Sequence, residues 1–277
     1  MNWLAGILKQ GSVEAVNVAN NHSHDYGAQG FADTLQTLQQ QNIAAFGYQH
    51  YQVHTINGKR IGLAGAKAWT LAQGMQAVDE AVAHFKNENI DYLMVSFHWG
   101  QERQYQANAT QRAIAHYAID QGVNTVLGHH PHVVQGMERY KNGVIVYSLA
   151  NFVFGGNGNP SDKDSVAVRL RVDFVGNKWV AHDVTAVPLL VSGRSQGNDY
   201  RPVWAADGAK QRVLRKMQTS SNVDVRLGWR GESQDGLAAT VPSAASGSKW
   251  CDDSASVWMA TGLLPPCNRD VITQHWG

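Results

Sequence analysis

Cysteine is almost absent from this sequence, because only Cys251 and Cys267 occur among its 277 residues. Both lie near the C-terminal end, so neither a thiolate metal site nor a disulfide-framed fold is indicated. An oxidising compartment would allow one bridge between them. Charged residues are also few, at 16%, and the formal net charge is +1 without a basic block. We therefore expect no nucleic-acid partner.

Long apolar runs are missing as well. No stretch of about 20 apolar residues occurs, so we expect no membrane-spanning helix. The first nine residues contain only a short apolar run with no basic segment ahead of it, and they do not resemble a signal peptide. The chain is long enough to bury a full core, either as one large domain with a tail or as two domains.

The sequence does contain a cluster of histidines. His129, His130 and His132 lie in the segment 128–132, directly after an apolar run. A neutral imidazole offers a lone pair to a metal ion. Pro131 favours extended backbone at His130, and alternate side chains of an extended segment share a face. We therefore expect His130 and His132 to point together and His129 to point away. The alternative is a loop of solvated or core histidines, but three imidazoles at a strand end favour a metal site.

Strands and helices alternate through the first half of the chain. The apolar patterns predict strands at 13–19, 43–46, 91–97 and 123–127, a hairpin of 53–56 with 60–64, and helices at 29–41, 75–87 and 110–121. Polar residues follow three of these strands. In open α/β sheets, ligands bind at the carboxyl ends of strands, so these residues are expected to converge.

The second half favours antiparallel strands. Runs rich in β-branched residues predict hairpins of 133–140 with 144–149 and of 165–175 with 178–191, followed by a short helix at 210–218. From residue 219 the composition shifts to Ser, Gly, Ala and Asp. We predict one α/β domain with a mixed sheet over 1–218 and a low-periodicity tail over 219–277, parts of which its tryptophans could dock.

Side chains suited to metal binding or proton transfer recur in the loops after three strands. They are Asn21, His22, His98, His130 and His132. Taken singly, His22 could hydrogen-bond Asp25, and His98 could pack beside Trp99. Their recurrence at three strand ends instead predicts one site.

Four segments carry a family resemblance: Asn20–Gly27, Phe97–Glu102, His130–Gln135 and Ser148–Phe154. With them the chain resembles the bacterial poly-γ-glutamate capsule synthesis proteins of the CapA type. That family is similar to the calcineurin-like metallophosphoesterases. The resemblance covers about residues 11–215 and implies a four-layer α-β-β-α sandwich with mixed sheets and a two-metal centre.

The resemblance also assigns roles to residues. It implies that the metal ligands are Asn21, His98, His130 and His132. His22 is expected as the acid near the leaving group, with Asp25 orienting it. Residues expected to support the ligands, water or substrate are Asn20, Glu102, His129 and Asn151. Ala150 stands where the family usually has glycine, so the turn there is expected to differ.

Two strands of the family have no counterpart here. Upstream of the Asn20–Gly27 segment, members carry one strand ending in Gly-Asp and another ending in Asn-Leu-Glu, and these carboxylates are ligands. The remaining ligands are neutral, and two divalent cations without an anionic bridge would repel each other. The spacing does not favour Asp25 or Glu102 as substitutes. We therefore expect an N-terminally incomplete domain, from a fragment or an incomplete gene model, with an uncovered sheet edge and lowered stability.

The expected function is that of a CapA-like, metal-dependent phosphoesterase-type hydrolase. Two divalent ions (Mn, Fe or Zn) would activate a water, and His22 would protonate the leaving oxygen. One alternative is a non-catalytic capsule assembly or export factor, and another is a mononuclear hydrolase using His98, His130 and His132. The resemblance implies a phosphoester or capsule-polymer substrate, other capsule synthesis or export proteins as partners, and a place in the cell envelope.

Overall fold

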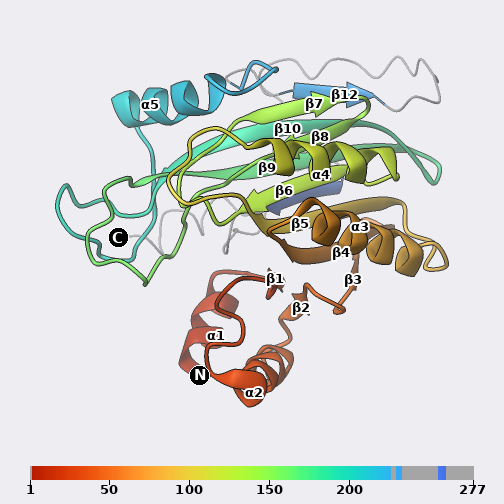
Figure 1. Ribbon diagram of the computed structural model, residues 1–277, viewed down its shortest axis with the longest axis horizontal. Helices are drawn as coiled ribbons and strands as arrows, with labels where there is room; N and C mark the ends of the chain where they lie inside the picture. The colour runs from red at the N-terminus through yellow and green to blue at the C-terminus, as the bar shows by residue number, and fades with distance from the viewer. Residues whose placement is uncertain (1, 226–228, 233–254, 260–277) are drawn as a thin grey trace.

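The computed structural model describes residues 2–225, 229–232 and 255–259, and two stacked β-sheets form its centre (Figure 1). The first sheet has the strand order β3-β4-β5-β6-β8-β7. Its strands are β3 (Gln52–Ile56), β4 (Lys59–Ala68), β5 (Tyr92–Trp99), β6 (Thr125–His129), β7 (Met137–Tyr140) and β8 (Gly143–Val146). The four inner strands are parallel, and the edge strands β3 and β7 are antiparallel to their neighbours. This is the predicted mixed sheet.

The second sheet is antiparallel. Its order is β11-β10-β9-β13, and β12 also pairs with β10. The strands are β9 (Asp164–Val175), β10 (Lys178–Leu190), β11 (Val203–Trp204), β12 (Trp229–Glu232) and β13 (Ala255–Met259). The long β9–β10 hairpin turns at Gly176, whose φ of 60° suits glycine, as the sequence predicted.

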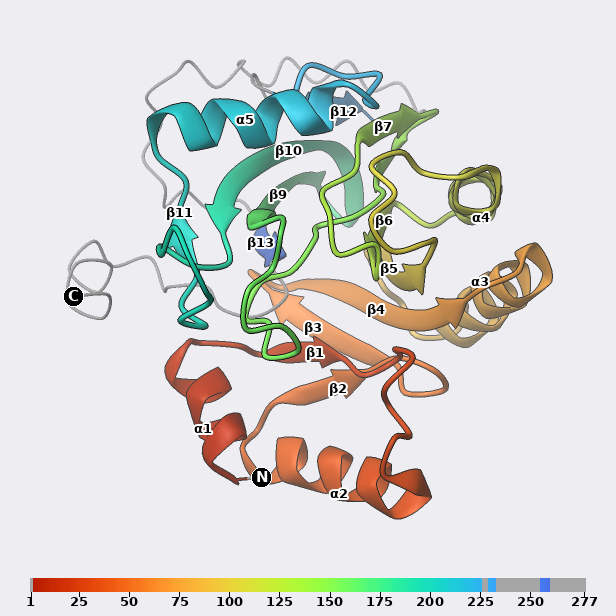
Figure 2. The same cartoon turned by 60° about the vertical axis from the view of Figure 1, so that its left-hand side comes forward.

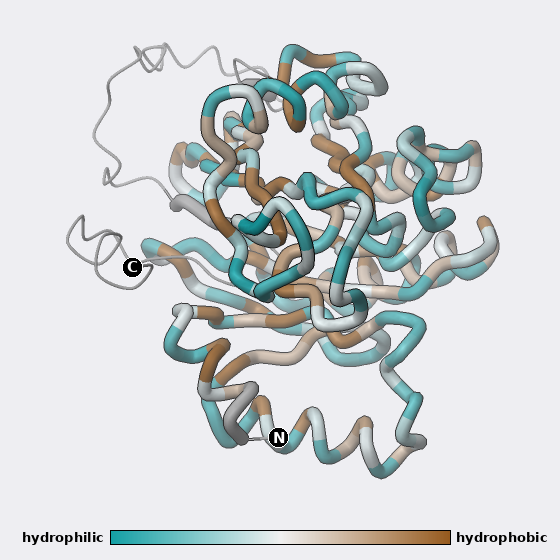
Figure 3. The backbone as a smooth tube through the Cα atoms, turned by 90° about the vertical axis from the view of Figure 1, so that its left-hand side faces the viewer, coloured by the Kyte–Doolittle hydropathy of each residue, from teal (hydrophilic) through white to brown (hydrophobic). Residues whose placement is uncertain are grey.

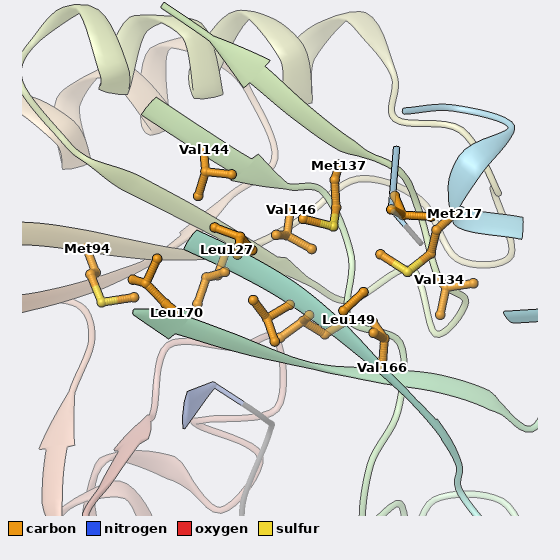
Figure 4. Close-up of a cluster of buried hydrophobic side chains, with 14 of the residues drawn as sticks. Met94, Leu127, Val134, Met137, Val144, Val146, Leu149, Val166, Leu170 and Met217 are labelled. Carbon is orange, nitrogen blue, oxygen red and sulfur yellow. The ribbon is translucent and has the colours of Figure 1, made fainter. Parts of the chain in front are cut away.

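The main hydrophobic core lies between the two sheets. Figure 4 shows Met94 and Leu127 of the first sheet facing Val166 and Leu170 of the second. These four side chains are at most 4% exposed. Full burial of such a side chain contributes about 1.5–3 kcal/mol, so this interface is the main source of stability of the sandwich.

Helices complete the layers. α3 (Leu71–Phe85) and α4 (Ala109–Asp120) pack on the outer face of the first sheet, and α5 (Asp207–Gln218) packs against β9 and β10. Each of the first two helices begins with a capping box, made by Thr70 with Gln73 and by Asn108 with Gln111, which satisfies N–H groups of the first turn. The order of helices and sheets confirms the predicted α-β-β-α sandwich.

The first 46 residues form a smaller unit beside the sandwich, which we call the N-terminal unit (Figure 2). It consists of α1 (Asn2–Gln10), β1 (Ala15–Asn17), α2 (Gly27–Gln40) and β2 (Ala44–Phe46), and the two strands pair in parallel. Apolar residues recur along α2 between polar ones (Figure 3), and Phe31, Leu35 and Leu38 pack into a separate small core. The unit therefore has a small core of its own, and Phe46 of β2 also packs into the main core.

Two segments beyond residue 218 pair with the second sheet, β12 with β10 and β13 with β9. The boundary between a domain of 1–218 and a tail of 219–277 remains a prediction. Cys251 and Cys267 lie outside the described residues. Within the described part of the chain, no helix is long and apolar enough to cross a membrane.

Candidate metal centre

A cleft of about 1420 Å³ lies between the sandwich and the N-terminal unit, and residues of both line it. His98 and His129, near the carboxyl ends of β5 and β6, are paired in register, so their side chains share a face of the sheet. That face also carries Leu127, which points into the main core. The expectation that His129 points away is therefore wrong. Because β6 continues through His129, the alternation that turns Leu127 inward also turns His129 towards the cleft.

The His130–His132 segment reaches the cleft by an unexpected backbone route. His130 has φ 98° and His132 has φ 59°, so the predicted extended geometry is wrong. The loop is bent by tertiary contacts, because the Arg103 N–H donates to the Pro131 carbonyl at 2.8 Å. These contacts override the local preference that the proline imposes. The two imidazoles still lie close, with ring centroids 5.9 Å apart, and both line the cleft.

Gly128 fixes where this loop begins. The Trp99 indole N–H donates to the Tyr147 carbonyl at 3.0 Å, across the position of Gly128. A Cβ at Gly128 would lie 1.9 Å from that carbonyl oxygen and 2.5 Å from the indole nitrogen. Only glycine allows this close approach, so the residue before the histidines serves packing rather than chemistry.

Three side chains bring their ligand atoms within 4.8 Å of one another: Glu102, His130 and His132. The Glu102 Oε1 lies 4.0 Å from the His132 Nε2. The structure therefore corrects the inference from spacing and places Glu102 among the candidate ligands. The loop after β5 turns back on the His130–His132 loop and delivers the carboxylate into the group.

Asn151 orients the His132 ring. Its Oδ1 lies 2.6 Å from the His132 Nδ1, and an amide oxygen can only accept, so Nδ1 carries the proton. The lone pair of Nε2 then faces Glu102, which is how metal-binding imidazoles are usually held. The neighbouring Ala150 has φ 62°, the conformation that glycine favours. The turn beside the cleft thus has a backbone suited to glycine, although alanine occupies it.

The donor set fits a divalent transition metal. Two imidazoles and one carboxylate suit zinc, manganese or iron, and the carboxylate supplies the negative charge that a set of neutral ligands lacks. The Nδ1 of His130 is buried and has no hydrogen-bond partner among the described residues. Buried polar atoms are normally satisfied, so this nitrogen is also available to a ligand.

A hydrogen-bonded chain connects the N-terminal unit to β5. The Asp25 Oδ2 accepts from the His22 Nδ1 at 2.8 Å, and the His22 Nε2 accepts from the Asn21 amide at 3.0 Å. The Asn21 Oδ1 in turn accepts from the His98 Nε2 at 2.7 Å. The Asn20 Oδ1 accepts the His22 backbone N–H at 2.8 Å and closes the loop. Asn20, Asn21 and His22 therefore line one wall of the cleft, and Asp25 contacts that wall through His22.

The inner imidazoles are neutral at pH 7. Burial, reinforced by the neighbouring histidines, lowers the pKa of His98 to about 3. Burial lowers the pKa of His129 to about 4. The pKa of His130 is also lowered, mainly by burial and to a smaller extent by repulsion from a protonated His132. Because a neutral imidazole keeps a lone pair, these residues stay competent to bind a metal ion at neutral pH.

Two aromatic residues beside the imidazoles were not expected from the sequence. Trp69 stands edge-on to His130, with ring centroids 4.7 Å apart, and Phe154 lies 5.0 Å from His132. Trp69 directly follows β4, so the strand-end rule could have identified it. Phe154 ends the Ser148–Phe154 segment of the family resemblance, but its contact with His132 depends on the path of the whole loop.

Comparison with known proteins gives a consistent family. The family model described as bacterial capsule synthesis protein PGA_cap matches residues 2–156. The capsule biosynthesis protein CapA of Bacillus anthracis is 30% identical over 233 residues, covering 76% of this chain and 54% of that protein. The PGA biosynthesis protein CapA of Bacillus subtilis (strain 168) is 33% identical over 209 residues, covering 66% of this chain and 55% of that protein. The chain thus spans about half the length of the curated relatives it matches.

A crystal structure of a hypothetical protein from Thermus thermophilus aligns with 67% of this chain and 91% of that chain. The TM-score is 0.38 and the sequence identity is 14%. This likeness is too weak to support a functional comparison.

Proposed function

The chain belongs to the bacterial capsule synthesis protein family PGA_cap, and we propose that its cleft is a divalent-metal centre that hydrolyses a phosphoester in poly-γ-glutamate capsule synthesis. The observation that carries the proposal is the convergence of Glu102, His130 and His132 within 4.8 Å. A bound divalent ion would lower the pKa of a coordinated water and polarise a phosphoryl oxygen.

The ligands fall into two groups. Glu102, His130 and His132 would hold one ion. His98, whose ring centroid lies 4.7 Å from that of His130, would hold a second ion together with Asn21. The Asn21 Oδ1 lies 2.7 Å from the His98 Nε2, which donates to it, so an ion bound by both atoms would take the place of the Nε2 proton, and His98 would carry its proton on Nδ1. His98 is not among the side chains whose ligand atoms lie within 4.8 Å of one another, and this supports a second ion over a single three-histidine site.

His22 is the proposed proton donor to the leaving oxygen. Its side chain is 74% exposed, so a substrate can reach it, and Asp25 holds its Nδ1. An imidazole has a pKa near neutrality and can act as a general acid at physiological pH. The His22 Nδ1 proton is given to Asp25, and the Nε2 accepts from the Asn21 amide in this arrangement. Before the transfer, Nε2 must therefore exchange that hydrogen bond for a proton, and the imidazolium then gives this proton to the leaving oxygen.

The names of the relatives support the wider role. The two Bacillus proteins are named for capsule and PGA biosynthesis. For this chain we propose a phosphoester or capsule-polymer-related substrate, other capsule synthesis or export proteins as partners, and a place in the cell envelope.

The direct experiment is a metal count combined with an activity assay. The purified chain would be incubated with Mn²⁺, Fe²⁺ or Zn²⁺, freed of unbound metal and measured by mass spectrometry. The same samples would be assayed on p-nitrophenyl phosphate and bis-p-nitrophenyl phosphate. We expect two equivalents of metal and measurable hydrolysis. His130→Ala should lose both, whereas His84→Ala, which removes an exposed histidine of α3, should lose neither.

Other results would point elsewhere. One equivalent of metal with full activity would favour the mononuclear hydrolase. A wild-type chain that binds no stoichiometric metal would contradict the proposal and favour a non-catalytic capsule assembly factor.

A further inference from the structure

The charge balance of the cleft depends on one side chain. Among the described residues that line it, the acidic ones are Glu14, Glu102 and Asp162, and Arg103 is the only lysine or arginine. Lys216 neutralises Asp162, with Nζ 2.8 Å from a carboxylate oxygen. Without Arg103, an anionic substrate would therefore meet acidic side chains and no lysine or arginine among the described lining residues before it reached a metal ion.

The Arg103 guanidinium makes no ion pair or hydrogen bond within the part of the chain that the structure describes, and the residue is exposed. Two arginines elsewhere in the sandwich are instead committed to carboxylates. Arg112 lies 3.5 Å from Glu138, and Arg212 lies 2.6 Å from Asp164. The charge of Arg103 is therefore available to a ligand.

The backbone holds Arg103 in place although its side chain has no partner among the described residues. Its φ is 61°, a conformation that costs a residue other than glycine about 1–2 kcal/mol. Its N–H donates to the Pro131 carbonyl at 2.8 Å, between the two candidate metal-binding histidines. The neighbouring Glu102 belongs to the metal-binding group. Arg103 is thus fixed at the mouth of the cleft, one residue from a proposed ligand.

We propose that Arg103 is a substrate-binding residue, which pairs with the oxygens of an anionic group on the molecule that enters the cleft. The proposal rests on the proposed hydrolysis. A guanidinium presents a planar fork of N–H donors that matches two oxygens of a phosphoryl group or a carboxylate. A phosphoester and a γ-linked glutamate chain both offer such oxygens, so the experiment must separate them.

Kinetics provide the first test. Arg103→Gln in the metal-loaded chain should raise KM for p-nitrophenyl phosphate roughly tenfold or more, because a charge-assisted hydrogen bond is lost. The metal content should stay at its wild-type value, and kcat should change by less than about twofold, because uniform binding affects KM alone. Arg103→Lys should recover part of the loss. Arg215→Gln removes an equal charge from the exposed side of α5 and should leave KM unchanged. An unchanged KM in Arg103→Gln would overturn the proposal.

Equilibrium binding provides the second test and needs no catalysis. Inorganic phosphate and a short γ-linked glutamate peptide would be titrated separately into wild type, Arg103→Gln and Arg215→Gln by calorimetry. Weaker binding in Arg103→Gln alone supports the proposal even if the chain hydrolyses nothing, and the ligand that shows the larger loss identifies the anion. If neither ligand binds wild type, or if both bind all three proteins equally, the proposal is wrong. Failure of the proposed function would appear separately, as missing metal or missing turnover.

Discussion

The two walls of the cleft are built differently. On the sandwich wall, Glu102, His130 and His132 come from loops that follow strands of the main sheet, and Asn151 orients one of the imidazoles. On the wall of the N-terminal unit, His22 lies in a short loop whose hydrogen bonds are mostly local. The His132 side chain is 32% exposed and that of His22 is 74% exposed. The first wall suits rigid metal binding. The second suits proton transfer to a substrate that arrives from solvent, and Asn21 is its one proposed metal ligand.

A small contact joins the walls. The Asn17 Nδ2 donates to the Ser96 Oγ at 3.0 Å, and the Asn17 Oδ1 accepts the Ala19 N–H at 2.9 Å. A Cβ at Gly65 would lie 2.5 Å from the Asn17 side chain, so β1 approaches the main sheet as closely as glycine permits. The distance between His22, the proposed proton donor, and the proposed metal ligands of the sandwich thus depends on a few side chains near β4 and β5.

The largest expected effect is on kcat, in a variant that tests whether the two walls have separate roles. His22→Ala should lower kcat about 100- to 10,000-fold, because a general acid is lost, while the metal content stays at its wild-type value. The measurement is turnover of p-nitrophenyl phosphate together with metal analysis of the same sample. His24→Ala, in the same loop, is the matched control, because His24 stacks on Phe31 instead of joining the hydrogen-bonded chain. Loss of metal in His22→Ala would show that the two walls do not have separate roles.

A smaller effect is expected where Asn151 supports the sandwich wall. Asn151→Ala removes the acceptor of the His132 Nδ1 proton and should weaken metal affinity about 10- to 100-fold. Competition with a chromophoric chelator measures that affinity. Asn151→Asp keeps an acceptor for the His132 Nδ1 proton and should retain most of the metal affinity. Equal affinity in the alanine variant would mean that the ring needs no such support.

Removing the Asn17 contact between the walls should lower both the stability of the chain and its turnover. Asn17→Ala leaves the Ala19 N–H and the Ser96 hydroxyl without their partner, which should lower the free energy of unfolding by about 1–3 kcal/mol. Turnover should fall and the second ion should bind more weakly, because Asn21 and His98 would share that ion across the two walls. Affinity for the ion held by Glu102, His130 and His132 should stay the same, because all three belong to the sandwich wall. Denaturant unfolding and the chelator assay measure the two quantities. A loss of affinity for the ion held by Glu102, His130 and His132 comparable to that of Asn151→Ala would contradict this division.

The smallest expected effect concerns an ionic contact behind the sandwich wall. Asp164 is buried, and burial raises its pKa, but hydrogen bonds from Arg212 and Lys216 outweigh that effect and hold the pKa below the ordinary value of 3.8. Asp164→Asn should lower the free energy of unfolding by about 1–2 kcal/mol at pH 7, since both cations are partly exposed.

The pH dependence of this effect has a definite sign. A carboxyl group with a lowered pKa in the folded state contributes stability above its unfolded pKa and loses that contribution as the pH falls through the folded pKa. The difference between wild type and Asp164→Asn should therefore be constant near neutrality and shrink below about pH 3.8. Asp120→Asn, which removes the partner of the exposed Lys141, should show little of either effect. A difference that grows in acid would rule out this origin.

Sequence patterns were sufficient for most of the fold. Apolar periodicity located β5, α4 and the β9–β10 hairpin within a few residues, because each has one regular buried face. The strand-end rule brought His98 and His130 to the same cleft. It could not place Glu102, because whether a residue four positions beyond His98 returns to the site depends on the path of the loop.

The sequence by itself therefore determined which side chains stand at strand ends, since alternation and turn residues are local properties. Only the tertiary structure decided how those side chains face one another. The bond from Arg103 to Pro131 links loops 28 positions apart and sets the left-handed backbone of His130, and the register of β5 with β6 turns His129 inward. Long-range contacts of this kind override local backbone preferences, and they complete the site with a carboxylate and an arginine that spacing alone did not reveal.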